Sequence, residues 1–120
     1  MKKERTIIKP FKDAFRGMAS AIKSERNLKI HLLAVVLVVA AGVYAKIKLT
    51  HWLILMVLMG MVLSAELLNT AIEKLVDLVK PDYNKDAGKV KDIAAAAVLI
   101  TSVSALIIAA MLVLEYWPTG

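Results

Sequence analysis

The chain has 120 residues, and 59% of them are hydrophobic, a larger share than soluble domains of this size usually carry. Its net charge is +6 at pH 7, and it has no cysteine, which excludes disulfides, thiolate metal sites and cysteine nucleophiles. This length fits one domain, residues 1–120. The composition therefore favours a small integral membrane protein, for which we expect no nucleic-acid partner.

The first predicted element is an amphipathic helix over about residues 6–25. Its basic residues lie on one side, and a basic face of this kind is attracted to anionic lipid at a membrane surface. The helix can equally be an orienting anchor and nothing more. The apolar residues that recur at helical spacing are Ile7, Ile8, Phe11, Phe15, Met18 and Ile22.

Three further segments predict membrane-spanning helices, over about residues 29–46, 50–78 and 90–116. Residues 93–114 are 22 positions without a charge, enough to cross a hydrocarbon layer of roughly 30 Å. The second segment includes an extension into the cytoplasm. The first is the shortest, and its alternative is a re-entrant or interfacial segment. We therefore expect an all-α integral membrane fold of three transmembrane helices plus the surface helix.

Lysine and arginine are unevenly distributed along the chain. Nine of the 16 precede Ile30, two lie between the first two spans, and five lie in residues 74–91. Because basic residues favour the cytoplasmic side, this distribution puts the N-terminus and residues 74–91 in the cytoplasm. A chain that crosses the membrane three times agrees with this distribution, and one that crosses it twice does not. We therefore expect a multi-pass protein of the plasma membrane with its polar site on the cytoplasmic side.

The second span carries a polar stripe. At about 100° per residue, Glu66, Asn69, Glu73 and Asp77 share one helix face about 80° wide. A charge at bilayer depth costs at least about 2.5 kcal/mol, so the stripe needs cations, partners or water opposite it. Glu73 and Asp77 alone could belong to a solvated helix end. Glu66 cannot, because a long apolar run immediately precedes it, and this favours a functional site.

Two charged clusters, residues 24–27 and Lys91 with Asp92, flank the same cytoplasmic end. Each alone is more typical of a helix cap. With the stripe, they supply acids that bind divalent cations, a lysine that pairs with phosphate and a carboxylate that can accept a hydroxyl proton. Phosphoryl transfer uses all three. None of the five glycines forms a Walker loop or a glycine-rich triplet, so the nucleotide would be held through magnesium and polar residues.

These residues also carry a family resemblance. Residues 66–73, Glu-Leu-Leu-Asn-Thr-Ala-Ile-Glu, followed by Val76 and Asp77 and later by Lys91-Asp92 and four alanines, resemble the prokaryotic diacylglycerol kinase family. The resemblance covers essentially the whole chain. Residues 25–31, Glu-Arg-Asn-Leu-Lys-Ile-His, resemble the Gram-positive branch, whose members prefer undecaprenol to diacylglycerol.

The resemblance implies a homotrimer that uses Mg²⁺ and ATP to phosphorylate a lipid alcohol at the cytoplasmic interface. By matching position, Glu66 would be the general base, with Asn69 beside it. Glu25 and Glu73 would hold magnesium on the ATP phosphates, and Asp77 would support this cluster. The remaining nucleotide contacts would be Asp13, Asp82, Tyr83, Asn84, Lys91 and Asp92.

Other interpretations stay open. The acceptor can be undecaprenol or diacylglycerol, because an apolar pocket made by helix packing distinguishes the two. A proton-coupled transporter subunit would explain Glu66 but leaves the charged cluster at the cytoplasmic edge without a purpose, and three helices are few for a transporter with internal repeats. A purely structural membrane partner leaves even Glu66 unexplained.

Two histidines and two glycines receive structural interpretations. His31 and His51 lie near the ends of spans, where a packed or interfacial histidine is commoner than a ligand. Gly42 and Gly60 lie within spans, where small residues allow close helix packing.

Overall fold

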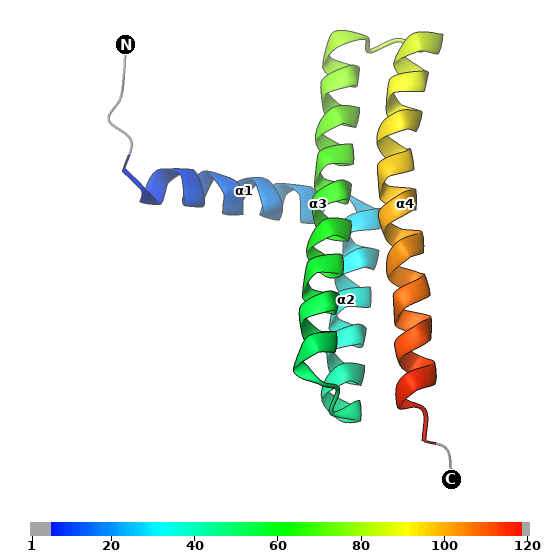
Figure 1. Cartoon of the computed structure of the whole chain (residues 1–120). Coiled ribbons are helices and arrows are strands. Elements are labelled where there is room, and N and C mark those ends of the chain that lie inside the picture. The colour runs from blue at the N-terminus through cyan, green and yellow to red at the C-terminus, as the bar shows by residue number, and fades with distance from the viewer. Residues whose placement is uncertain (1–5, 119–120) are drawn as a thin grey trace.

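The computed structural model describes residues 6–118, and this part of the chain is all-helical, with no strand. Its helices are α1 (Ile8–Ser24), α2 (Arg26–Ala45), α3 (Leu49–Val79) and α4 (Lys85–Tyr116). Figure 1 shows α1 lying crosswise to a bundle in which α3 packs against both α2 and α4. The prediction of an all-α fold, with three helices able to span a membrane and a further helix before them, is confirmed.

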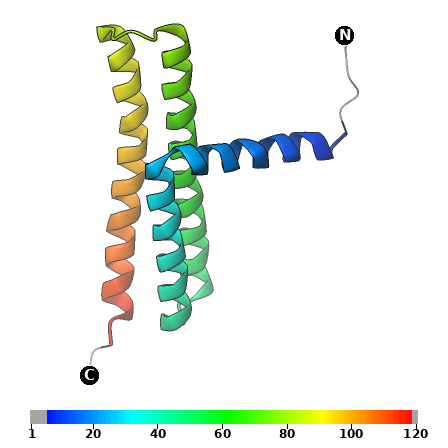
Figure 2. The ribbon, with the colours of Figure 1, turned by 180° about the vertical axis from the view of Figure 1, so that it is seen from behind.

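The helices α2, α3 and α4 are each long and apolar enough to cross a membrane. The 20 residues of α2 correspond to about 30 Å, which favours a full crossing over a re-entrant segment. With 31 and 32 residues, α3 and α4 exceed the hydrocarbon layer. Figures 1 and 2 show where the extra length lies: the end of α3 and the start of α4 extend together past α1.

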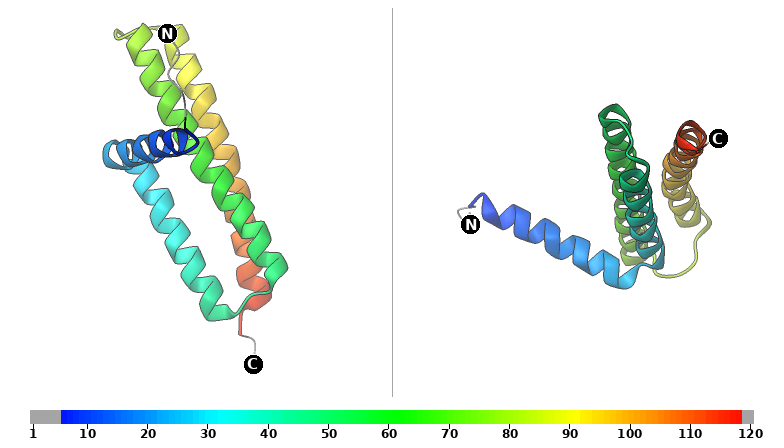
Figure 3. Two further views of the ribbon diagram at one scale, coloured as in Figure 1. Left: turned by 90° about the vertical axis from the view of Figure 1, so that its left-hand side faces the viewer. Right: turned by 90° about the horizontal axis from the view of Figure 1, so that it is seen from below.

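One residue separates α1 from α2. Glu25 has extended backbone angles, φ −114° and ψ 114°, and its N–H donates to the carbonyl oxygen of Ala21. The chain therefore turns sharply there, and Figure 3 shows α1 projecting away from the bundle. Ala21, near the end of α1, is the buried residue of this helix, whereas Phe11 and Phe15 are exposed. One apolar face of α1 is thus left open within the single chain.

Hydrogen bonds fix both ends of the bundle. At the α3–α4 turn, Asn84 Oδ1 accepts from the backbone N–H groups of Asp86 and Ala87 at 2.9 and 3.1 Å, so this side chain caps α4. At the opposite end, the Tyr116 hydroxyl lies 2.9 Å from the N–H of Lys48 and 2.6 Å from His51 Nδ1. These contacts hold α3 and α4 in register.

The buried core of a single chain is small, and its apolar members are Ala21, Leu28, Leu55, Val62 and Ala94. Most other apolar side chains of the spans point outward, as expected where lipid or another subunit covers them. In the described part of the chain, the buried polar residues all lie on α3: Glu66, Asn69 and Thr70. The fold therefore places a polar patch at the centre of an otherwise apolar bundle.

Candidate active site

Among residues 6–118, the most deeply buried charged residue is Glu66. It lies on α3 and is 3% exposed. Its Oε2 lies 3.7 Å from Nε2 of His31, which belongs to the first turns of α2. The negative charges of Glu25 and Glu73 are near enough to act on the same carboxylate. The α1–α2 junction and the middle of α3 thus bring three carboxylates and an imidazole together.

Asn69 lies one turn beyond Glu66 on α3. Its Nδ2 donates to Glu73 Oε1 at 2.7 Å, which fixes the orientation of both side chains. Its Oδ1 is buried and has no hydrogen-bond partner within residues 6–118. Leaving a buried polar atom unpaired costs about 1–3 kcal/mol, so this oxygen marks a place where a ligand can bind.

A second group of charges lies farther along α3. Lys91 on α4 donates to Asp77 Oδ1 at 2.6 Å, and both side chains are partly exposed to solvent. Lys74 Nζ lies 4.0 Å from Glu25 Oε1. The stripe therefore runs from the buried Glu66 to a more open cluster in which two lysines face carboxylates.

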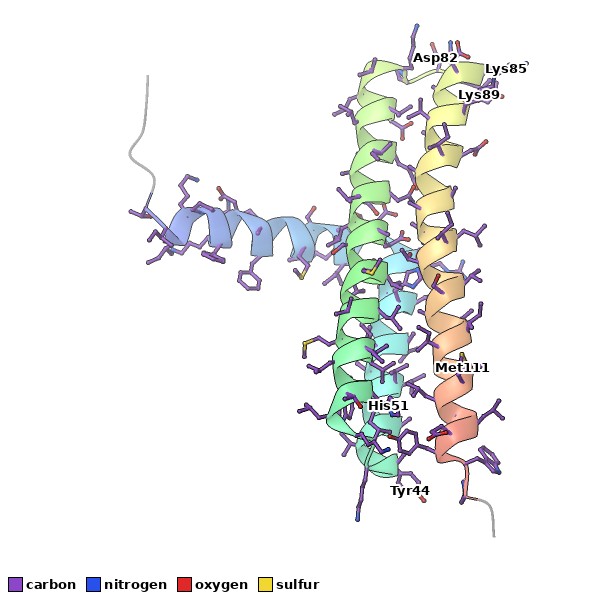
Figure 4. The ribbon with its side chains drawn as sticks, in the orientation of Figure 1. Tyr44, His51, Asp82, Lys85, Lys89 and Met111 are labelled. Carbon is purple, nitrogen blue, oxygen red and sulfur yellow. The ribbon has the colours of Figure 1, made fainter. Side chains whose placement is uncertain are left out.

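The other predicted nucleotide residues are not joined to this cluster. Asp13 is exposed on α1 and pairs with Lys9 and Arg16 on the same helix, at 3.3 and 3.6 Å. Asp82 and Tyr83 are exposed at the α3–α4 turn, where Figure 4 labels Asp82 beside Lys85 and Lys89.

Asn84 and Asp92 are the other two of these residues. Asn84 uses its Oδ1 to cap α4, and Asp92 is exposed on that helix. Helical rise puts this turn roughly 20 Å from Glu66 along α3. Within residues 6–118, no ion pair or side-chain hydrogen bond connects the residues of the turn, or Asp13, to Glu66, Asn69 or Glu73.

The side chains around Glu66 include oxygen donors that bear on magnesium binding. The part of the chain that the structure describes contains no group of three or more histidines, aspartates and glutamates that could hold a metal. Mg²⁺, however, is usually bound by one or two carboxylates together with substrate phosphates. The carboxylates of Glu25 and Glu73 and the unpaired oxygen of Asn69 are donors of the kind Mg²⁺ prefers, so these residues fit a magnesium–nucleotide complex.

Sequence reasoning missed His31. Its position at the start of a span suggested packing, but the structure places its imidazole against Glu66. Residues 31 and 66 are on different helices, so no periodicity within one helix could have paired them. The available signal was that both are ionisable residues inside predicted spans.

The fold and the site together define a small helical membrane protein with an acid-rich centre suited to phosphoryl transfer. A family model described as prokaryotic diacylglycerol kinase matches residues 12–113. The chain is 37% identical over 108 residues to an undecaprenol kinase of Bacillus subtilis, covering 90% of this chain and 88% of that protein.

Two relatives named diacylglycerol kinase are also similar. The one from Synechocystis is 34% identical over 90% of this chain and 62% of its own length, and the one from Escherichia coli is 31% identical over 84% and 83%. The chain belongs to the prokaryotic diacylglycerol kinase family. It is accordingly a lipid kinase, a phosphotransferase with an alcohol group as acceptor.

Proposed function

We propose that this chain transfers the γ-phosphoryl group of ATP to the hydroxyl of undecaprenol, with Mg²⁺, at the cytoplasmic face of the plasma membrane. The observation that carries the proposal is Glu66, which is 3% exposed on a spanning helix beside two other carboxylates. A buried carboxylate of this kind suits a base that meets an interfacial hydroxyl.

In the proposed reaction Glu66 accepts the proton of the lipid hydroxyl while the hydroxyl oxygen attacks the γ-phosphorus. A bond forms between that oxygen and phosphorus, and the bond between phosphorus and the bridging oxygen of ADP breaks. Asn69, held by its hydrogen bond to Glu73, would position the groups beside the base. The chain supplies no covalent nucleophile in this scheme.

Magnesium would be held by Glu25 and Glu73, and it would offset the negative charge of the ATP phosphates. Lys91 would pair with phosphate and exchange its contact with Asp77 for it, while Asp77 keeps the lysine in place before the nucleotide binds. The remaining proposed nucleotide contacts are Asp13, Asp82, Tyr83, Asn84 and Asp92.

We further propose a homotrimer in which α1 lies on the cytoplasmic membrane surface. The exposed apolar side chains of α1 and its basic residues support this placement of the helix. The outward-facing apolar surface of the spans and the small core of one chain support the presence of neighbouring subunits. Asp13 and the α3–α4 turn lie apart from Glu66 in one chain, and neighbours could bring such residues to a shared site.

The choice of undecaprenol rests on sequence similarity. Identity to the protein named undecaprenol kinase is 37%, and residues 25–31 resemble the branch with that preference. Diacylglycerol is the second candidate acceptor, because the relatives that carry that name are 34% and 31% identical over most of the chain. Both acceptors require the same base and the same magnesium–nucleotide contacts.

The test is phosphate transfer from labelled ATP by the purified protein in lipid vesicles. Undecaprenol and diacylglycerol are offered separately, and each is assayed with magnesium and with magnesium withheld. Magnesium-dependent phosphorylation of undecaprenol supports the whole proposal. A preference for diacylglycerol keeps the kinase and overturns the acceptor, whereas transfer to neither would overturn the proposed reaction and favour the transporter interpretation.

A further inference from the structure

The contact between His31 and Glu66 has no role in the reaction described so far. The two atoms, His31 Nε2 and Glu66 Oε2, are 3.7 Å apart, which is longer than a direct hydrogen bond. The His31 side chain is 21% exposed, and it comes from a different helix than Glu66. An ionisable pair inside spanning segments is expensive to maintain and is a functional candidate by default.

The two atoms are close enough that one oxygen atom, lying to the side of the line that joins them, can contact both. An oxygen about 2.8 Å from each of two atoms that are 3.7 Å apart makes a hydrogen bond of ordinary length to both. Glu66 can accept one such bond, and an imidazole N–H can donate the other. A hydroxyl offers both a hydrogen and a lone pair at a single oxygen.

His31 also borders an apolar cavity. This cavity has a volume of about 200 Å³ and extends from His31 between α2 and α4, past Ala34, Val38, Val62 and Ala105. An apolar cavity of about 150 Å³ is large enough to hold benzene, so this one has room for several carbons of a hydrocarbon chain. A lipid whose first carbons occupy it would carry its hydroxyl to His31, which lines the cavity, and so toward Glu66, which contacts His31.

We propose that His31 is a catalytic residue that binds the acceptor hydroxyl, with its Nε2–H donating to the hydroxyl oxygen while Glu66 Oε2 accepts the hydroxyl hydrogen. This inference rests on the proposed function. In the transfer step, the hydroxyl proton passes to Glu66 and one oxygen lone pair forms the bond to the γ-phosphorus. The other lone pair stays hydrogen-bonded to His31, which keeps its own proton, and the bond to ADP breaks.

The experiment compares His31→Leu with His31→Gln in the purified full chain, reconstituted in vesicles with Mg-ATP and either undecaprenol or diacylglycerol. Leucine has a similar size but no donor, whereas the glutamine amide nitrogen can take the place of Nε2. For His31→Leu we expect kcat/KM for the lipid alcohol to fall about ten- to a hundredfold. The KM for ATP should not change, and His31→Gln should retain most of the activity.

The matched control is His51→Leu, the same substitution near the start of α3, where Figure 4 labels His51. There His51 contacts Tyr116 and not the site. Its kcat/KM for the lipid alcohol should equal that of the unmodified chain. If His31→Leu proves unstable in gel filtration, His31→Asn replaces it. The asparagine amide is too short to reach the Nε2 position, so we expect it to be impaired while glutamine is active.

The outcomes separate this inference from the proposed function. If the unmodified chain phosphorylates no lipid alcohol, the proposed function fails. If it is active and the variants lacking a donor at Nε2 match it, His31 does not bind the hydroxyl. Equal impairment of the leucine and glutamine variants, or a raised KM for ATP in either, would show a structural role and overturn the inference.

Discussion

The ammonium group of Lys91 on α4 lies 2.6 Å from Oδ1 of Asp77 on α3, and this contact joins the two long helices beyond the buried part of the site. The side chains are 37% and 61% exposed, so water screens their attraction. Exposed pairs of this kind contribute about 0–1 kcal/mol to stability. The lysine is therefore available to an incoming phosphate at little cost to the fold.

Replacing Lys91 should impair ATP use without unfolding the protein. For Lys91→Met we expect kcat/KM for ATP to fall roughly tenfold or more, because a charge-assisted contact to phosphate is lost. The free energy of unfolding should change by less than about 1 kcal/mol. Kinase assays at varied ATP and thermal unfolding in detergent measure the two quantities. Lys89→Met, an exposed lysine on the same helix, is the control, and an equal loss in both variants would contradict the prediction.

Replacing Glu66 should remove turnover. Glutamine keeps the size of the side chain and its capacity to accept a hydrogen bond, but it cannot take the hydroxyl proton. We therefore expect Glu66→Gln to insert and fold normally, with kcat lower by about 10²- to 10⁴-fold and the KM for ATP unchanged. Glu115→Gln, at an exposed position near the C-terminal end of α4, provides the matched control. A Glu66→Gln variant with near wild-type turnover would remove Glu66 from the role of base.

Magnesium dependence tests Glu25 and Glu73. Transfer should stop when the metal is removed by a chelator and return when Mg²⁺ is added. In Glu25→Gln and Glu73→Gln, the magnesium concentration for half-maximal activity should rise roughly tenfold or more, since each lost charged contact contributes at least about 1.4 kcal/mol. A magnesium titration of the initial rate measures this shift. An unchanged requirement, as expected for Glu115→Gln, would rule out the two glutamates as magnesium ligands.

The helical architecture was predictable because a bilayer leaves few choices to an apolar run of about 20 residues. The shared face of Glu66, Asn69 and Glu73 was predictable for a similar reason, since the helical period fixes it and the contact between Asn69 and Glu73 at 2.7 Å agrees with it. The start of α4 at Lys85 was not predictable, because hydropathy marks only where a helix enters lipid. The helix begins five residues before the expected span, since the Asn84 side chain caps it there.

Contacts between helices could not be predicted from the sequence. The pairing of His31 with Glu66 depends on how α2 packs against α3, and the pairing of Lys91 with Asp77 depends on the length of the α3–α4 turn. The use of the Asn84 side-chain oxygen to cap α4 was not predicted either. Propensity and spacing act along one element, so they carry no information about which faces of two elements meet.

At the end of the bundle opposite the site, α2 and α3 pack closely together at Gly42. Gly42 is buried on α2, and a Cβ atom there would lie 2.6 Å from Cη2 and 2.8 Å from Cζ2 of Trp52 on α3. The indole would have to move, and overpacking of this kind costs about 1–3 kcal/mol. We therefore expect Gly42→Ala to lower the thermal unfolding midpoint in detergent.

Gly17→Ala is the matched control, because a Cβ at Gly17 on α1 meets nothing within 4 Å. Alanine is favoured over glycine in a helix by up to about 1 kcal/mol, so this variant should be as stable as the unmodified chain or slightly more stable. The turnover of correctly folded Gly42→Ala protein should be unchanged, because Trp52 lies near the start of α3 and Glu66 lies about four turns farther along the helix. Equal midpoints for the two variants would show that α2 and α3 can separate at Gly42 without loss of stability.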